Sequence, residues 1–393
     1  MKVPKVVLFL EDSRQYGRGL AWGIARYSRL YGPWTFYRDT PFYSGNKKRK
    51  DVSWIKKWGA DGIIARDFEF FGQLLDLNLP IISASAFIDH TNENLIEIIT
   101  DNIKIGHLAL DHFTNRGFKH FAYCGFKDMP WSIGREQSYE SILREKGHSL
   151  HCFNSSSIRT SNWDKEYPRM NKWLKSLPKP IGILCCNDDR GCDLIEVSKE
   201  AGFKVPYEIA VLGVDNDSQV CELSNPPLSS IRLDVEGAGF QAASILDKLM
   251  AGKKNQVRTI IAEPFEVISR QSTDTTAISD QIVVDAMQFI KQNDKRLIQV
   301  TDVTHAVGCS RRGLDEKFKR FLGHSVFAEI RRIRTDNIGR MLIETNLSIS
   351  QIAFQLGYHD PDHIARFFRQ EKNMTPQAYR KKFSTRIAAL KNE

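Results

Sequence analysis

The chain has 393 residues, enough for two to four domains, and its apolar content of 41% is ordinary for a folded protein. Residues 281–393 contain 20 lysines and arginines against 12 aspartates and glutamates, so they carry +8 of the formal net charge of +9. A neutral front and a basic back favour a nucleic-acid partner for the back. The apolar run at 6–10 is too short for a signal peptide or a membrane span, so we expect no membrane partner.

Up to about residue 270, short apolar runs alternate with longer amphipathic ones. The short runs predict strands at 6–10, 62–65, 80–83, 96–100, 121–124, 181–186 and 209–214. The amphipathic stretches predict helices at 19–30, 102–116, 135–146, 189–201 and 235–250. Strands that alternate with helices indicate parallel sheets covered on both faces, and two series of such units predict two lobes with a cleft between them.

Polar residues follow several of these strands, and ligands bind outside the carboxyl ends of such sheets. The residues expected to contact a ligand are Asp12, Ser13, Asn187, Asp188, Asp189, Asp215 and Asn216, with Arg135 from a helix of the second lobe. Carboxylates and amides accept hydrogen bonds and arginine donates them in a fork, which suits a neutral polyhydroxyl ligand such as a sugar. Trp22, Trp131 and Trp163 are candidates for an apolar face against the sugar ring. The alternative for each Asp or Asn is a turn or a helix cap.

Neither catalysis nor a metal is favoured by the sequence. Asp188 and Asp189 are adjacent and therefore do not face each other, and no G-x-G-x-x-G, G-x-x-x-x-G-K-[ST] or G-x-S-x-G motif occurs. Cys185, Cys186 and Cys192 have no histidine nearby, so we expect no metal site and no cofactor. The odd number of seven cysteines, mostly in apolar runs, indicates reduced thiols in a cytoplasmic protein.

The back of the chain contains one pattern twice. The first copy is Val303-x3-Val307-Gly308-x-Ser310-x3-Leu314-x3-Phe318, and the second is Ile352-x3-Leu356-Gly357-x2-Asp360-x3-Ile364-x3-Phe368. Helix, glycine turn, N-cap and helix, in this order, predict two helix-turn-helix motifs at about 300–320 and 348–370. Two copies imply a clamp on two successive major grooves. A helix at 327–344 separates them and would span about 27 Å, near the ~34 Å between groove faces one turn apart.

The second helix of each motif should present one face to DNA, because Leu314, Phe318, Ile364 and Phe368 point to the core. The residues expected on the opposite face are Arg311, Arg312, Asp315, Lys319, Asp362, His363, Arg366 and Arg369. Arg312 and Arg366 are predicted to read bases, since arginine donates two hydrogen bonds to guanine. Lys319 and Arg369 are predicted to meet phosphates. The alternative for each is a solvated surface charge.

The motifs resemble two known families. Leu212-Gly213-Val214-Asp215-Asn216, the run from Leu184 to Asp188, and Gly134-Arg135 resemble the ligand-binding core of LacI-type regulators and periplasmic sugar-binding proteins. The segments Ser310-Arg311-Arg312-x-Leu314, Gly357-Tyr358, Phe367-Phe368-Arg369 and Thr375-Pro376-x-x-Tyr379-Arg380 resemble the AraC/XylS family. The first resemblance implies that Arg135, Asn187 or Asp188, and Asp215 hold a sugar. The two parts in this order are similar to regulators of xylose operons, which implies D-xylose and gene activation.

The expected architecture is an α/β, two-lobed, periplasmic-binding-protein-like domain followed by an all-α domain with two helix-turn-helix motifs. We assign the sensor to 1–272, a linker to 273–281 and the DNA-binding domain to 282–393. The expected function is a sugar-responsive transcription regulator, with double-stranded DNA, a homodimer partner and RNA polymerase as partners. The alternatives are a sugar-modifying enzyme and a transport-type sugar-binding protein, each with a DNA-binding tail.

Overall fold

The computed structural model describes residues 3–38, 52–66, 71–84, 95–156, 163–275, 278, 280–358 and 360–381. The chain divides into two compact units, Met1–Ala277 and Ile278–Glu393. The predicted linker, 273–281, spans this boundary. The expected α/β front and helical back are confirmed, because the first unit contains two largely parallel sheets and the second contains helices alone in its described part.

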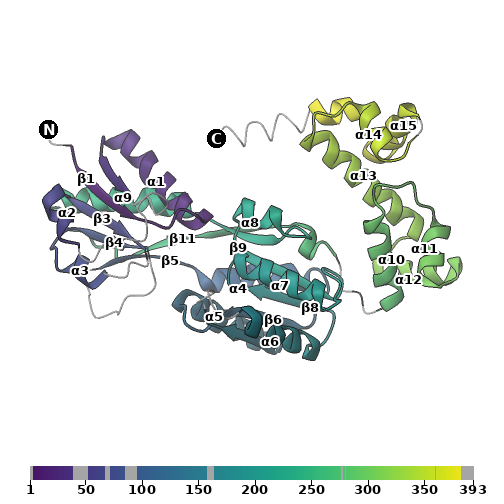
Figure 1. Cartoon of the computed structure of the whole chain (residues 1–393), viewed down its shortest axis with the longest axis horizontal. Helices are drawn as coiled ribbons and strands as arrows, with labels where there is room; N and C mark the ends of the chain where they lie inside the picture. The colour runs from purple at the N-terminus through teal and green to yellow at the C-terminus, as the bar shows by residue number, and fades with distance from the viewer. Residues whose placement is uncertain are drawn as a thin grey trace. The chain divides into compact units, whose positions relative to one another are not determined.

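The first lobe is a parallel sheet in the order β11-β5-β4-β3-β1-β2 (Figure 1). Its strands are β1 Lys5–Phe9, β2 Thr35–Arg38, β3 Gly62–Ala65, β4 Ile81–Ser83, β5 Ile96–Thr100 and β11 Thr259–Ala262. Its helices are α1 Gln15–Tyr31, α2 Ser53–Trp58, α3 Phe71–Leu75 and α9 Val235–Met250. Strands β1 and β3 are buried over most of their length, as their unbroken apolar runs require for a sheet covered on both faces.

The second lobe has the sheet order β12-β10-β9-β8-β6-β7, with only β12 antiparallel to its neighbour. Its strands are β6 Phe121–Phe126, β7 Leu150–Ser155, β8 Ile181–Cys185, β9 Ile209–Asp215, β10 Ser229–Leu233 and β12 Pro264–Ile268. Its helices are α4 Asn102–Thr114, α5 Pro130–Glu145, α6 Trp163–Ser176, α7 Asp188–Glu200 and α8 Ser218–Leu223. The chain crosses between the lobes after β5, β10 and β11, so the carboxyl ends of these three strands lie at the crossings.

Helices α1 and α9 contact each other through their backbones. A Cβ atom on Gly23 would lie 2.0 Å from the carbonyl oxygen of Glu236, and one on Gly239 would lie 2.3 Å from that of Leu20. Only glycine allows this approach. The close packing fixes the direction of α1 and therefore places its first turn, which begins after Arg14.

The second unit consists of α10 Gln281–Gln292, α11 Val300–Val307, α12 Arg311–Leu322, α13 Val326–Glu344, α14 Ile349–Gln355 and α15 Pro361–Lys372. Both glycine turns have left-handed backbones, with φ of 61° at Gly308 and 77° at Gly357. Ser310 accepts a hydrogen bond from the Gly313 amide at 3.2 Å, and Asp360 accepts one from the Asp362 amide at 2.8 Å. Both predicted N-caps are therefore confirmed. Residue 359, in the second turn, lies outside the described residues.

Each helix-turn-helix has its own small core. Val303, Leu314 and Phe318 are buried in the first, and Ile352, Ile364 and Phe368 pack with Ile338 and Leu342 of α13 in the second. Helix α13 contacts α10, α11 and α12 as well as α14 and α15, so it joins the two motifs. No described helix is long and apolar enough to cross a lipid bilayer.

Candidate ligand site and nucleic-acid interface

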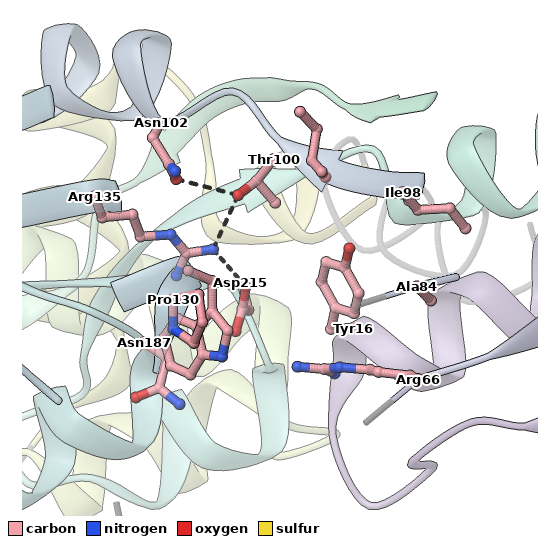
Figure 2. A pocket seen from close by; sticks show the side chains of 12 residues that line it. Tyr16, Arg66, Ala84, Ile98, Thr100, Asn102, Pro130, Arg135, Asn187 and Asp215 are labelled. Carbon is pink, nitrogen blue, oxygen red and sulfur yellow. Dashed lines mark hydrogen bonds and ion pairs between the residues drawn. The ribbon is translucent and has the colours of Figure 1, made fainter. Parts of the chain in front are cut away.

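A cavity of about 190 Å³ lies between the two lobes of the first unit (Figure 2). The residues that line it are Tyr16, Arg66, Ala84, Ile98, Ile99, Thr100, Asn102, Pro130, Trp131, Arg135, Asn187 and Asp215. Ala84, Ile98, Pro130 and Trp131 provide apolar surface, whereas the arginines, amides and Asp215 provide polar groups. An apolar lining with a few convergent polar groups is typical of a small-molecule site.

Arg135, in the first turns of α5, is the central donor of this cavity. Its side chain is only 4% exposed, and its guanidinium donates to the carbonyl oxygen of Cys186 and to Thr100 Oγ1, the latter at 3.5 Å. The guanidinium carbon lies 5.3 Å from the centre of the Trp131 ring. These contacts hold the plane of the guanidinium. Arg135 Nε is nevertheless buried without a hydrogen-bond partner among the described residues.

Asp215, at the end of β9, is the matching acceptor. Its Oδ1 lies 3.9 Å from Arg135 Nη2 and has no hydrogen-bond partner in the described part of the chain. Burial raises the pKa of Asp215 to about 6, against the opposing charges of Arg135 and Arg66. A buried donor and a buried acceptor that both lack a partner are uncommon in folded proteins, and here both belong to residues that line the cavity.

Asn187 and Trp131 complete the predicted part of the cavity. Asn187 caps α7, where its Oδ1 accepts from the Arg190 amide at 3.0 Å, so its Nδ2 remains for a ligand oxygen. Trp131 gives the flat apolar surface that a sugar ring needs. Trp22 does not, because it is 61% exposed on α1 and is not among the lining residues. The side chain of Trp163 lies outside the described residues.

Four polar lining residues were not predicted: Tyr16, Arg66, Thr100 and Asn102. The guanidinium carbon of Arg66 lies 4.5 Å from the centre of the Tyr16 ring, and both face the cavity from the first lobe (Figure 2). Thr100 Oγ1 donates to Asn102 Oδ1 at 3.2 Å. Arg66 directly follows the predicted strand 62–65, so the rule that identified Asp215 would have identified it too.

The other predicted ligand residues do not line the cavity. Asp12 is paired with Arg38 at 2.9 Å, and Ser13 is exposed beside Arg14. Asp189 forms an ion pair with Arg14 at 2.8 Å, and Asn216 Oδ1 accepts from Arg270 at 3.0 Å. Each of these four side chains has a protein partner among the described residues, and none of them lines this cavity.

Asp188 does not line the cavity either. It is 3% exposed, and its carboxylate accepts from the Asp217 amide at 2.7 Å and from the Ser230 hydroxyl. Burial and the neighbouring Asp215 raise the pKa of this carboxyl. A Cβ on Gly213 would lie 2.3 Å from Asp188 Oδ1, so the glycine in Leu212-Gly213-Val214 makes room for the carboxylate. Asp188 therefore stabilises the end of β9 through its hydrogen bonds to Asp217 and Ser230.

The predicted DNA face of α12 and α15 is largely open to solvent. The residues on it that are exposed are Arg311, Arg312, Lys319, Asp362, His363, Arg366 and Arg369. Asp315 is different, since it is half-buried and accepts from the Val326 amide at 3.0 Å, which joins α12 to the start of α13. Arg312 forms an exposed pair with Glu316, at 3.0 Å. His363, Arg366, Phe367, Arg369 and Gln370 line an open groove on α15.

Two family models match the chain. A periplasmic binding protein-like domain matches residues 110–273, and a helix-turn-helix domain matches residues 303–382. The xylose operon regulatory protein of Escherichia coli is 27% identical over 96% of both chains, and that of Haemophilus influenzae is 28% identical over 96% of this chain and 98% of its own. The solved structure of a xylose-binding transcription activator superposes with a TM-score of 0.82 at 26% identity, covering 98% of this chain and 99% of the other.

The chain is a homologue of the xylose operon regulatory proteins. The match extends over both units, so the chain combines a periplasmic-binding-protein-like sensor with an AraC-type helix-turn-helix domain. It is a sugar-sensing transcription regulator and not an enzyme. The sensor shares its fold with a periplasmic binding protein/LacI regulator of Alkaliphilus metalliredigens, which has a TM-score of 0.57 at 19% identity and covers 70% of this chain and all of the other.

Proposed function

We propose that the chain activates transcription in response to D-xylose, which binds in the cavity between the lobes. The observation that carries the proposal is the pair formed by Arg135 and Asp215. Each has a buried polar atom without a partner among the described residues, and both residues line a cavity with an aromatic wall. The sugar itself is taken from the relatives, whose names specify xylose.

The proposed binding residues are Arg135, Asn187 and Asp215 of the second lobe, with Tyr16 and Arg66 of the first. A ligand held by both lobes stabilises their closed arrangement, because it binds that arrangement better than any open one. Sugar hydroxyls both donate and accept, so the ligand can donate to the Asp215 carboxylate and accept from the Arg135 guanidinium. Trp131 would lie against the apolar face of the ring.

The proposed output is binding to two successive half-sites in promoter DNA by a homodimer in the cytoplasm, where it would recruit RNA polymerase. Arg312 and Arg366 are proposed to read base edges, with Arg311, Asp362 and His363 beside them, and Lys319 and Arg369 to contact phosphates. The exposed basic faces of α12 and α15, backed by buried Leu314, Phe318, Ile364 and Phe368, support this assignment.

The deciding experiment is calorimetric titration of the purified chain with D-xylose, L-arabinose, D-ribose and D-glucose. D-xylose should bind most tightly, and Arg135→Ala combined with Asp215→Ala should abolish both the binding and the response of DNA affinity to sugar. Asp12→Asn is the matched control, because Asp12 also follows a strand but pairs with Arg38 outside the cavity. The proposal is wrong if the double variant keeps a sugar response, or if another sugar binds more tightly.

A further inference from the structure

The segment that leads out of the sensor is anchored to the second lobe by buried side chains. Ser272 and Thr273 are fully buried, and the Ser272 hydroxyl donates to the carbonyl oxygen of Val211 in β9 at 2.6 Å. Thr273 Oγ1 donates to Ser229 Oγ at 2.7 Å and lies 2.8 Å from His112 Nε2. The second unit begins at Ile278, so this anchored segment, residues 270–273, leads directly into the DNA-binding unit. We call it the root of that unit.

Arg270 connects this segment to the end of β9. Its Nη1 donates to Asn216 Oδ1 at 3.0 Å and to the carbonyl oxygen of Leu228 at 3.0 Å, while its Nε binds Glu222 at 2.6 Å. The backbone of Arg270 is bonded twice to Ser229, because its amide donates to the Ser229 hydroxyl and its carbonyl accepts from it. Arg270 therefore contacts Asn216 with a side chain that is 13% exposed and Ser229 with its backbone.

Asn216 is the residue next to Asp215, and both have left-handed backbones, with φ of 51° and 105°. Positive φ is uncommon outside glycine, and Asp and Asn adopt it more readily than other residues do. The Asn216 amide donates to Ser230 Oγ at 3.0 Å, and Arg270 holds its side chain. A ligand that contacts Asp215 would therefore act directly on a turn whose next residue is held by Ser230 and Arg270.

We infer that Asn216 and Arg270 are positioning residues that couple the ligand cavity to the root of the DNA-binding unit. The inference rests on the proposed function and specifies how the sugar signal leaves the cavity. A ligand hydroxyl on Asp215 fixes the turn at residues 215–216. Arg270 transmits the position of that turn to residues 270–273, whose bonds reach α4, β9 and β10 of the second lobe. The second lobe is thus the lobe through which the sensor acts.

The test compares the affinity of full-length protein for one DNA duplex with and without saturating D-xylose. The duplex is enriched from a random library by the wild-type protein in the presence of D-xylose. Arg270→Ala should bring the ratio of the two DNA affinities to within about twofold of one, while its affinity for D-xylose changes by less than about threefold. Arg232→Ala is the matched control, because Arg232 lies on the same sheet and pairs with Glu266 instead.

A second pair of variants keeps the test decisive if Arg270→Ala does not fold. Glycine adopts the left-handed backbone without strain, and Asn216→Gly removes the side chain that Arg270 contacts, so this variant should lose the same coupling. Asn216→Asp keeps an oxygen that can accept from Arg270, so this variant should retain the coupling. In a double-mutant cycle, Arg270→Ala should have no further effect on coupling in the Asn216→Gly background.

The outcomes separate the two hypotheses. The coupling role is overturned if both Arg270→Ala and Asn216→Gly keep the wild-type ratio, or if either abolishes D-xylose binding, because the residue then serves the cavity itself. A wild-type protein that binds D-xylose without any change in DNA affinity overturns the proposed function instead.

Discussion

Arg14 and Asp189 form a forked ion pair that joins the two lobes of the sensor. Arg14 Nε lies 2.8 Å from Asp189 Oδ2, and Nη2 lies 2.9 Å from Oδ1. Arg14 precedes α1 in the first lobe, and Asp189 lies in the first turn of α7 in the second. Beside this pair, Asp217 accepts from the Gln15 amide at 2.7 Å and from Arg18 at 2.9 Å. These contacts form only when the lobes are close together.

Removal of this fork should weaken sugar binding without touching the cavity. Asp189→Asn lowers the population of the closed arrangement, and apparent affinity falls in proportion to that population. The side chains are 40% and 20% exposed, so the pair contributes at most about 1 kcal/mol and the loss of D-xylose affinity should be at most about fivefold. Calorimetry measures it, and Asp12→Asn, which breaks the Arg38 pair within one lobe, should have no effect. Unchanged affinity in Asp189→Asn would show that the fork does not contribute to closure.

Sugar binding should also depend on pH through Asp215. Its pKa is raised to about 6, so in the free protein the carboxylate becomes protonated as the pH falls through that value. The protonated form cannot accept hydroxyl hydrogen bonds at both oxygens. D-xylose affinity should therefore be constant above about pH 7 and fall about tenfold per unit below pH 6. Calorimetry over this range measures the slope, and Asp215→Asn should remove it while lowering affinity throughout.

Asp215 should make stability depend on pH in the opposite direction to sugar binding. Its folded pKa lies above the ordinary value of 3.8, so the folded chain holds the proton more tightly than the unfolded chain does. Its contribution to the free energy of unfolding is fully present below about pH 4 and is lost as the pH rises through 6. At neutral pH the sugar-free protein thus contains an ionised, partly buried Asp215, and a ligand that donates to this carboxylate would stabilise its charge.

The sequence predicted the architecture because its signals are local. Strand 62–65 is an unbroken apolar run and strand 96–100 contains three isoleucines, and the structure forms both with the same bounds. Strands β7 and β10 were missed since they mix polar and apolar residues, as in Ser229–Leu233, where three-dimensional context decides burial. Gly308 and Ser310 were sufficient to predict the first helix-turn-helix, because a left-handed turn and an N-cap have clear residue preferences.

The site was predicted only in part, because the position of a residue after a strand does not determine the direction of its side chain. Asp215 faces the cavity, whereas Asp188 turns back over β9, where Gly213 leaves space. Asp189, one residue further along α7, reaches Arg14 in the other lobe. That partner is 175 residues away in the sequence, and no local pattern indicates it.

The two proposed classes of DNA contact should differ in their dependence on sequence and salt. Arg366→Ala should relax base preference at one position of each half-site, at a cost of about 1–3 kcal/mol for the preferred base. Lys319→Ala should weaken all duplexes alike and lower the slope of log affinity against log salt by about 1. Fluorescence anisotropy with variant duplexes measures both. Lys253→Ala removes an exposed lysine from the sensor and should change neither; identical behaviour of Arg366→Ala and Lys319→Ala would refute the assignment.

Replacement of Asp188 should lower the stability of the first unit more than it lowers the affinity for the sugar. Asp188→Ala leaves the Asp217 amide and the Ser230 hydroxyl buried without their acceptor, which costs about 1–3 kcal/mol for each group. Urea unfolding followed by tryptophan fluorescence should show the loss in the transition of the first unit. Asp188→Asn retains one acceptor oxygen and should lose less, since burial already raises the pKa of Asp188 and favours its uncharged form. If Asp188→Ala were as stable as wild type and failed only in sugar binding, Asp188 would be a ligand residue after all.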